Sequence, residues 1–291
     1  MQFNVSGHLE YTVRFPSTLI LNIHAQKNSG QLILQENFVV QPPLARVEEF
    51  QLTDGCSRFV RLETGNAAQF TIDYTATVDC SHEIVPANTI DQTPVGEMDR
   101  SAIPYLFPSR YCQSDRLSRL AWDLFGGIPH PYDKVLAIVD WIHDNVEYVI
   151  GSTDSETSAY DTVTQRTGVC RDFAHLGIAL CRALNIPARY FSGYAYQLDP
   201  PDFHACFECF VGGKWFLFDA TGLAPLNGLV RIGTGRDAAD SAVASTFGRV
   251  QCTLMTVDCQ LAPNQQFEPL GRTQLSRNGL SLGSGRVQNS N

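Results

Sequence analysis

Three residue types that together perform acyl transfer occur in this sequence in a suggestive order. Cys170 lies in the segment TGVCRDFA (167–174), where a glycine turn precedes what we predict to be the first turn of a helix. The unpaired N–H groups and the positive dipole end at that position stabilise a thiolate. His204 and Asp219 follow downstream. The chain therefore offers a nucleophile, a base and an orienting carboxylate.

His204 and Asp219 are predicted to lie on the two strands of one hairpin. The glycine pair at 212–213 separates two aromatic-rich runs, which is typical of a two-residue turn. That register puts Cys206 opposite Asp219, and it makes His204 a diagonal neighbour on the same face, at about 7–8 Å between backbones. The carboxylate can then hold one imidazole nitrogen while the other faces a thiol. A register slip of one residue would destroy this arrangement.

Four further polar residues near these three are expected to have structural roles. On a helix that begins at Cys170, His175 lies about 140° around the axis from the cysteine, so direct contact is not expected. Arg171 and Asp172 flank the nucleophile, and Asp172 is placed to interact with the helix dipole. Glu208 shares a strand face with the predicted base, and we expect it to form an ion pair.

The first 95 residues consist of short alternating runs broken by turn signals, which predicts an all-β region. The clearest run spans 67–78, where the apolar residues all face one way: Phe70, Ile72, Tyr74, Ala76 and Val78. A β-sandwich is the simplest closure of such strands. We recognise no set of catalytic residues in this region, so we expect a structural or partner-docking module.

Helical periodicity follows after a proline-marked connection. Ser114 is placed to cap the first helix, and Pro131 suits the first turn of the second. The third helix is predicted to begin near Cys170 and to end before Pro187, because proline prevents its continuation. A strand is expected over 188–194.

These patterns divide the chain into three parts. We expect an N-terminal β-sandwich domain over 1–95 and a catalytic domain over 96–262. The remainder, 263–291, is rich in Gln, Asn, Ser, Gly and Arg, and we expect it to be a mobile C-terminal tail.

The composition is that of an ordinary globular protein, with 44% apolar and 18% charged residues. The 21 basic and 30 acidic residues give a net charge of −9, which argues against a nucleic-acid or anionic-membrane partner. No window approaches the ~20 apolar residues of a membrane span, and no secretory signal is visible at the start. We therefore expect a cytoplasmic protein without a membrane partner. The oligomeric state is not predictable from these features.

The nine cysteines are expected to be mostly reduced and buried, because nothing marks the chain for secretion. They are residues 56, 80, 112, 170, 181, 206, 209, 252 and 259. Cys206 and Cys209 form a CxxC pair, but no second pair completes a zinc site, and on a strand the two thiols point to opposite faces. The segment 233–237 lacks the spacing of a nucleotide-binding loop. We expect neither a metal nor another cofactor.

Several segments carry a family resemblance when they are taken in order. They are YDTV (160–163), GVCRDFA (168–174), PARY (187–190), GY (193–194), HA (204–205), Trp215 and FD (218–219). Together they resemble the transglutaminase-like superfamily, and more closely its bacterial branch of cysteine proteases and amidases with an added N-terminal β domain. The resemblance covers roughly residues 100–260 in detail and the N-terminal region more loosely.

The resemblance implies an α+β fold, with a papain-like, transglutaminase-like cysteine proteinase core preceded by an all-β sandwich domain. It also implies that Cys170 is the nucleophile, His204 the base and Asp219 the residue that orients the base. The family's aromatic and oxyanion-stabilising residues are not placed by the sequence, and Trp141, Tyr148 and Tyr160 are all candidates. The backbone N–H of Cys170 is a further oxyanion donor.

Three functions are compatible with these residues. The first is a cysteine protease or amidase that cleaves peptide or isopeptide amides through a thioester on Cys170. The second is a transglutaminase that joins glutamine to an amine, and the third is a non-catalytic binding module. The first two share every catalytic residue, and we favour hydrolysis because water is the default acceptor unless it is excluded. The complete Cys-His-Asp set argues against the third. We expect a peptide or protein substrate.

Overall fold

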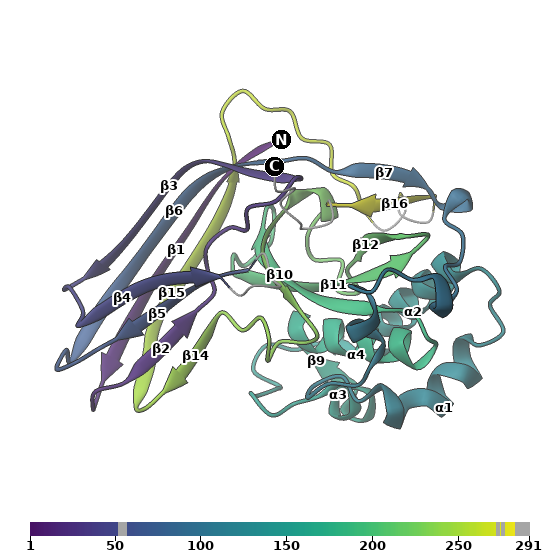
Figure 1. The fold of residues 1–291 in the computed structure, drawn as a ribbon, viewed down its shortest axis with the longest axis horizontal. Helices are drawn as coiled ribbons and strands as arrows, with labels where there is room; N and C mark the ends of the chain where they lie inside the picture. The colour runs from purple at the N-terminus through teal and green to yellow at the C-terminus, as the bar shows by residue number, and fades with distance from the viewer. Residues whose placement is uncertain (52–56, 272–273, 275–276, 283–291) are drawn as a thin grey trace.

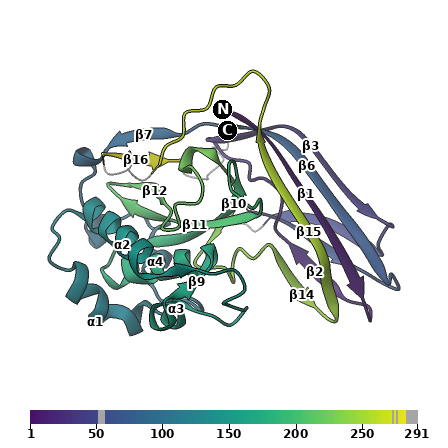
Figure 2. The ribbon, with the colours of Figure 1, turned by 180° about the vertical axis from the view of Figure 1, so that it is seen from behind.

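A computed structural model describes residues 1–51, 57–271, 274 and 277–282. A β-sandwich lies at one end of its long axis and the helices gather at the other (Figures 1 and 2). The helices are α1 (Ser114–Phe125), α2 (Pro131–Asn145), α3 (Ala159–Gln165) and α4 (Cys170–Ala183), with short 3-10 turns at Ala87–Thr89, Val95–Glu97, Ile103–Leu106 and Leu226–Gly228. The strands are β1 (Gln2–Val13), β2 (Thr18–Leu21), β3 (Gln31–Gln41), β4 (Arg46–Gln51), β5 (Arg58–Glu63), β6 (Gln69–Cys80), β7 (Glu83–Pro86), β8 (Glu147–Tyr148), β9 (Thr167–Gly168), β10 (Ala188–Ala195), β11 (Phe203–Val211), β12 (Lys214–Phe218), β13 (Leu229–Gly235), β14 (Ala244–Phe247), β15 (Val250–Leu261) and β16 (Asn278–Ser281).

The N-terminal region is the predicted β-sandwich. Its two antiparallel sheets have the strand orders β15-β1-β6-β3 and β14-β2-β5-β4. Alternate residues of β6 are buried, as the run over 67–78 predicts. They join one apolar core with residues of β1, β2 and β5. Burial of a continuous apolar face between two sheets is what stabilises this layer.

The sandwich also contains strands from far along the chain. β14 and β15 lie within 244–261, which the sequence assigns to the catalytic domain, yet they pair with β2 and β1 of the sandwich. Without β15, β1 would be an edge strand with a row of unpaired backbone groups. The two regions are therefore connected by more than one crossing of the chain, as both views of the ribbon illustrate (Figures 1 and 2).

Part of the expected C-terminal tail is ordered against the fold. β16 (Asn278–Ser281) pairs antiparallel with β7, and Leu280 and Leu282 are buried. Gly279 is required there, because a Cβ would lie 2.6 Å from the ring of Phe216. Earlier in the same segment, Phe267 packs against an aromatic residue of β1. The rest of the expectation falls on 272–273, 275–276 and 283–291, which lie outside the described residues.

The helical region is built around the sheet β12-β11-β10-β13, with α4 packed on β11. Gly177 of α4 allows this close approach, since a Cβ there would lie 2.5 Å from the ring of Phe207. The predicted combination of a β-sandwich and an α+β core is confirmed. It places α4 beside β11, which carries His204, and Asp219 directly follows β12.

The helices begin close to the predicted positions. Pro131 is the first residue of α2 and Cys170 the first of α4, as expected. The expected cap at Ser114 is wrong by one residue, because Ser114 is already helical and Gln113 occupies the cap without a side-chain hydrogen bond. Across the described ranges, every helix falls short of the combination of length and hydropathy that a bilayer-spanning segment needs.

Candidate active site

Cys170 is the first residue of α4, and its side chain is partly exposed. The helix begins here because Val169 is extended and the carboxylate of Asp172 turns back to accept a hydrogen bond from the Val169 N–H at 2.9 Å. Gly168 makes room for this turn, since a Cβ there would lie 2.8 Å from the Cβ of Asp172. The thiol therefore lies at the positive end of a helix whose N-terminus is capped by Asp172, its third residue.

β11 and β12 form the predicted hairpin in the predicted register, with Val211 opposite Lys214. Both turn residues have positive φ angles, +56° at 212 and +76° at 213, which glycine adopts without strain. The register brings His204 and Asp219 together, with 2.8 Å between His204 Nε2 and Asp219 Oδ2. Both side chains are buried. Because Nε2 is taken by the carboxylate, Nδ1 is the ring nitrogen that remains for a thiol.

The surroundings of His204 favour its protonated form. Burial alone lowers the pKa of His204, but attraction to Asp219, the hydrogen bond with Asp219 and the nearby side chain of Cys170 outweigh it and raise the pKa to about 10. The imidazole is therefore cationic at neutral pH. A cation in contact with Cys170 stabilises the thiolate.

Hydrogen-bond donors keep Asp219 ionised. One of them, Thr221, was not among the candidate residues in the sequence analysis. Burial raises the pKa of Asp219, but attraction to His204 and hydrogen bonds from His204 and Thr221 outweigh it, so the pKa lies below its usual range. The Thr221 N–H and Oγ1 each lie 2.8 Å from Asp219 Oδ1. The segment 219–222 has the Asp, Thr and Gly residues that favour a turn, and this turn also fixes the carboxylate.

Tyr148 is the one of the three aromatic candidates that contacts the nucleophile. Its hydroxyl lies close enough to the backbone N–H and the side chain of Cys170 for both to affect the pKa of Tyr148. Burial, together with the proximity of Cys170, raises the pKa of Tyr148 to about 12, so the hydroxyl keeps its proton. Trp141 instead packs against Phe125 at 6.2 Å between ring centroids, and Tyr160 lies under the guanidinium of Arg116.

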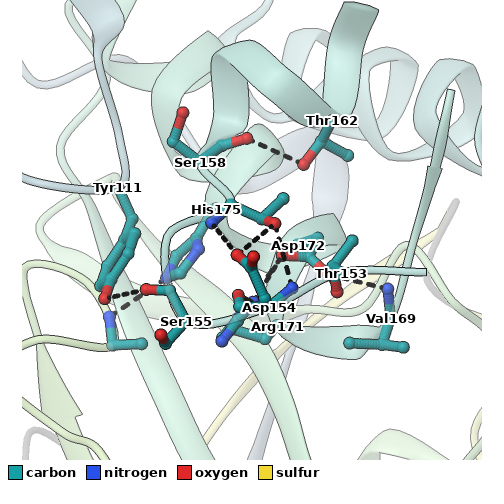
Figure 3. Close-up of polar contacts among 12 residues, drawn as sticks. Tyr111, Thr153, Asp154, Ser155, Ser158, Thr162, Val169, Arg171, Asp172 and His175 are labelled. Atoms are coloured by element: carbon teal, nitrogen blue, oxygen red, sulfur yellow. Dashed lines mark hydrogen bonds and ion pairs between the residues drawn. The ribbon is translucent and has the colours of Figure 1, made fainter. Parts of the chain in front are cut away.

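His175 is buried away from the reactive group, as its position on the helix predicts. Its ring stacks on Tyr111 at 5.0 Å between centroids, and Nε2 accepts a hydrogen bond from the Ala238 N–H (Figure 3). Burial holds the pKa of His175 well below its ordinary value, so the ring is neutral. His143 on α2 has a structural contact too, since its Nδ1 lies 3.0 Å from the carbonyl oxygen of Ala220.

Glu208 forms the expected ion pair, and it does so with two arginines. The Arg189 Nε lies 2.6 Å from Glu208 Oε2, and the guanidinium of Arg231 bonds to Oε1. All three side chains are buried, with Glu208 on the histidine strand β11, Arg189 on the adjacent strand β10 and Arg231 on β13, which lies beyond β10. This network links three strands of the sheet that carries His204.

The cysteines of the CxxC pair point into different parts of the core, as predicted. Cys206 packs with Phe191, whereas the sulfur of Cys209 lies 3.5 Å from that of Cys181 on α4. All eight described cysteines are free and six of them are buried, while Cys56 lies outside the described residues. Within the described ranges, no group of three or more His, Cys, Asp or Glu side chains is arranged to hold a metal ion.

Comparisons with known proteins agree with this geometry. The family model of the transglutaminase-like superfamily matches residues 118–220, and that of the bacterial transglutaminase N-terminal domain matches residues 1–101. A crystal structure of a candidate cysteine protease from Cytophaga hutchinsonii is 53% identical, covers 97% of this chain and 98% of its own, and superposes with a TM-score of 0.93. The chain belongs to the transglutaminase-like superfamily. Membership in this superfamily and the likeness to that protein support a thiol-dependent enzyme.

Two mycobacterial relatives match a smaller region. An uncharacterised protein from Mycobacterium leprae is 32% identical over 120 residues, which is 38% of this chain and 43% of that protein. One from Mycobacterium tuberculosis is 33% identical over 114 residues, or 34% of this chain and 36% of that protein. The matched region of this chain thus spans less than half the length of these relatives.

Proposed function

We propose that this protein is a cysteine hydrolase that cleaves peptide or isopeptide amides through a thioester on Cys170. The observation that carries the proposal is a buried, hydrogen-bonded His204–Asp219 pair whose imidazole lies close enough to the partly exposed thiol of Cys170 for the thiol to raise the pKa of His204. A thiolate–imidazolium pair needs this arrangement of a helix N-terminus, a base with a raised pKa and an ionised orienting carboxylate.

The reaction follows from the protonation states of these groups. The Cys170 thiolate attacks the carbonyl carbon of the amide, and the imidazolium of His204 gives its proton to the departing amine. Water then attacks the thioester carbon while the now neutral His204 takes a proton from that water, and the C–S bond breaks to release the carboxylic acid and the Cys170 thiolate. Asp219 keeps the imidazole in one orientation and stabilises its cationic form. Partial exposure of Cys170 supports water as the acceptor, because solvent reaches the thioester position.

The negative oxygen that develops on the carbonyl would be stabilised by two donors beside Cys170. These are the backbone N–H of Cys170 and the hydroxyl of Tyr148, which lies beside Cys170. Since the pKa of Tyr148 is raised to about 12, this donor is retained throughout the neutral and mildly alkaline range.

Tyr148→Phe is therefore expected to lower kcat by roughly 100-fold with a much smaller change in KM, because a donor used in the transition state is lost. Steady-state kinetics on one peptide substrate check this. Tyr160→Phe is a matched control, since Tyr148 and Tyr160 are both 37% exposed and Tyr160 packs under Arg116 away from Cys170. Equal losses of kcat in both variants would contradict a role for Tyr148 in oxyanion stabilisation.

The choice of acceptor is tested by product analysis. A glutamine-containing peptide is incubated with the protein and a primary amine, and the products are identified by mass spectrometry. We expect cleavage of the peptide bond or conversion of glutamine to glutamate to exceed amine incorporation. An excess of amine adduct would overturn hydrolysis in favour of transamidation. Absence of both products across a panel of peptides would overturn acyl transfer.

A further inference from the structure

A buried carboxylate lies two residues beyond the proposed nucleophile. Asp172 has no solvent-exposed surface, and its Oδ2 accepts hydrogen bonds from the Val169 N–H at 2.9 Å and from Thr153 Oγ1 at 2.7 Å (Figure 3). These contacts close the first turn of α4 and join it to the loop that follows β8. A buried charge of this kind is costly unless it is hydrogen-bonded and paired.

Arg171 supplies the opposite charge at the same place. Its Nε and Nη2 lie 3.4 and 3.3 Å from Asp172 Oδ1, and Nη2 also donates to the carbonyl oxygen of Asp154 (Figure 3). The Arg171 side chain is 26% exposed, so water screens it only in part. The two residues after Cys170 therefore form a cation–anion pair that is anchored to the hydroxyl of Thr153 and the backbone carbonyl of Asp154.

Arg171 and Asp172 are the second and third residues of the helix that Cys170 begins, so both charges lie within one helical turn of the reactive thiol. Burial raises the pKa of the nearby Tyr190, Cys170 and Asp172 raise it further, and Arg171 lowers it. A carboxylate this close disfavours a thiolate, and a guanidinium favours it. The other titratable groups that face Cys170 are Tyr148 from β8, Tyr190 from β10, and His204 and Cys206 from β11, with Asp219 behind His204.

We propose that Arg171 and Asp172 are a pair of positioning residues that set the ionisation of Cys170 by opposing effects. Asp172 closes the helix turn that presents the thiol, and Arg171 offsets the negative charge that this closure introduces. The inference rests on the proposed function only in taking Cys170 as the reactive thiol. It requires no particular substrate or acceptor.

The test is the pH dependence of alkylation of Cys170 by iodoacetamide, followed by mass spectrometry of the labelled peptide in the full chain. Arg171→Gln is expected to slow alkylation at pH 7 about fivefold and to move the midpoint of the profile to higher pH, because Asp172 is then uncompensated. Arg171→Lys should restore most of the rate, since it keeps the charge. Asp172→Asn should move the midpoint in the opposite direction, because the amide oxygen can still accept from Val169.

Arg119→Gln is the matched control, because this arginine is 95% exposed on α1 and pairs with Asp123. Its profile should coincide with that of the parent. The proposal is overturned if Arg171→Gln also coincides with the parent, or if Arg171→Lys is as slow as Arg171→Gln. It is overturned as well if the two single variants shift the midpoint in the same direction. If Asp172→Asn fails to fold, the two Arg171 variants alone still test the proposal. None of these readouts depends on turnover, so failure of the proposed hydrolysis would be seen separately.

Discussion

Cys170→Ala is expected to reduce turnover to the level of the uncatalysed reaction while the protein stays folded. The thiol is the only group in the proposed mechanism that forms a covalent bond with the substrate, so no neighbouring group can replace it. The side chain is partly exposed at the first position of α4, where alanine is compatible with the helix. Loss of the sulfur therefore removes chemistry and little packing. The measurement is steady-state turnover of a cleaved peptide, together with the thermal unfolding midpoint.

Cys252→Ala provides the control, because Cys252 is an exposed free cysteine on β15 of the sandwich. It should keep full activity, which separates the effect of losing a thiol from the effect of losing the nucleophile. Retention of turnover in Cys170→Ala would end the thioester mechanism. A large fall in the unfolding midpoint of Cys170→Ala would show that the thiol has a structural role that its exposure does not suggest.

The geometry of His204 and Asp219 was predictable because it depends on local rules. The glycine pair at 212–213 fixes the turn, the turn fixes the register, and the period of two along each strand decides which side chains share a face. The start of α4 at Cys170 follows from equally local signals, namely a preceding glycine and an acidic residue in the first turn.

Tyr148 could not be chosen over Trp141 and Tyr160 from the sequence, because its position depends on a parallel pairing. β8 has two residues and pairs with β9 directly before Cys170, while all of α3 lies between them in the chain. Parallel pairs require such crossovers and leave no turn signature. α3 itself was missed although Ser158 and Asp161 form a capping box, which is a readable signal in a short helix.

The extent of the sandwich was not predictable for the same reason. β15 pairs with β1 across most of the chain length, and the exposed residues of β15 resemble those of any surface strand. Composition likewise suggested mobility after residue 262, whereas β16 is fixed by two leucines and a glycine that fit against the core. Local propensity carries no information about which distant edge a strand will cover.

Asp219→Asn is expected to lower kcat by roughly three orders of magnitude, a smaller loss than with Cys170→Ala. The amide that replaces the carboxylate carries no charge, so it cannot stabilise an imidazolium. Its NH₂ group and the His204 N–H are both donors and cannot hydrogen-bond to each other. Burial then acts on His204 without the compensating carboxylate, and only Cys170 is left to oppose it, so the pKa of His204 falls from about 10. The parent should therefore keep its activity up to about pH 10, whereas the variant should lose the cationic form at lower pH. Profiles of kcat/KM against pH measure both limits.

The same change has a defined effect on stability. In the parent, the raised pKa of His204 adds to the free energy of unfolding, fully so below the ordinary value of about 6.5, and this contribution is lost as the pH rises towards about 10. In Asp219→Asn that contribution is absent, so the difference in unfolding midpoint between the two proteins should be largest near pH 6 and should shrink towards pH 10. Thr221→Val is a graded control, because it removes one hydroxyl donor to Asp219 and leaves the His204 contact in place. A midpoint difference that stays constant from pH 6 to pH 10 would mean that Asp219 stabilises the fold without holding the proton on His204, and the proposed base would then lack its orienting charge.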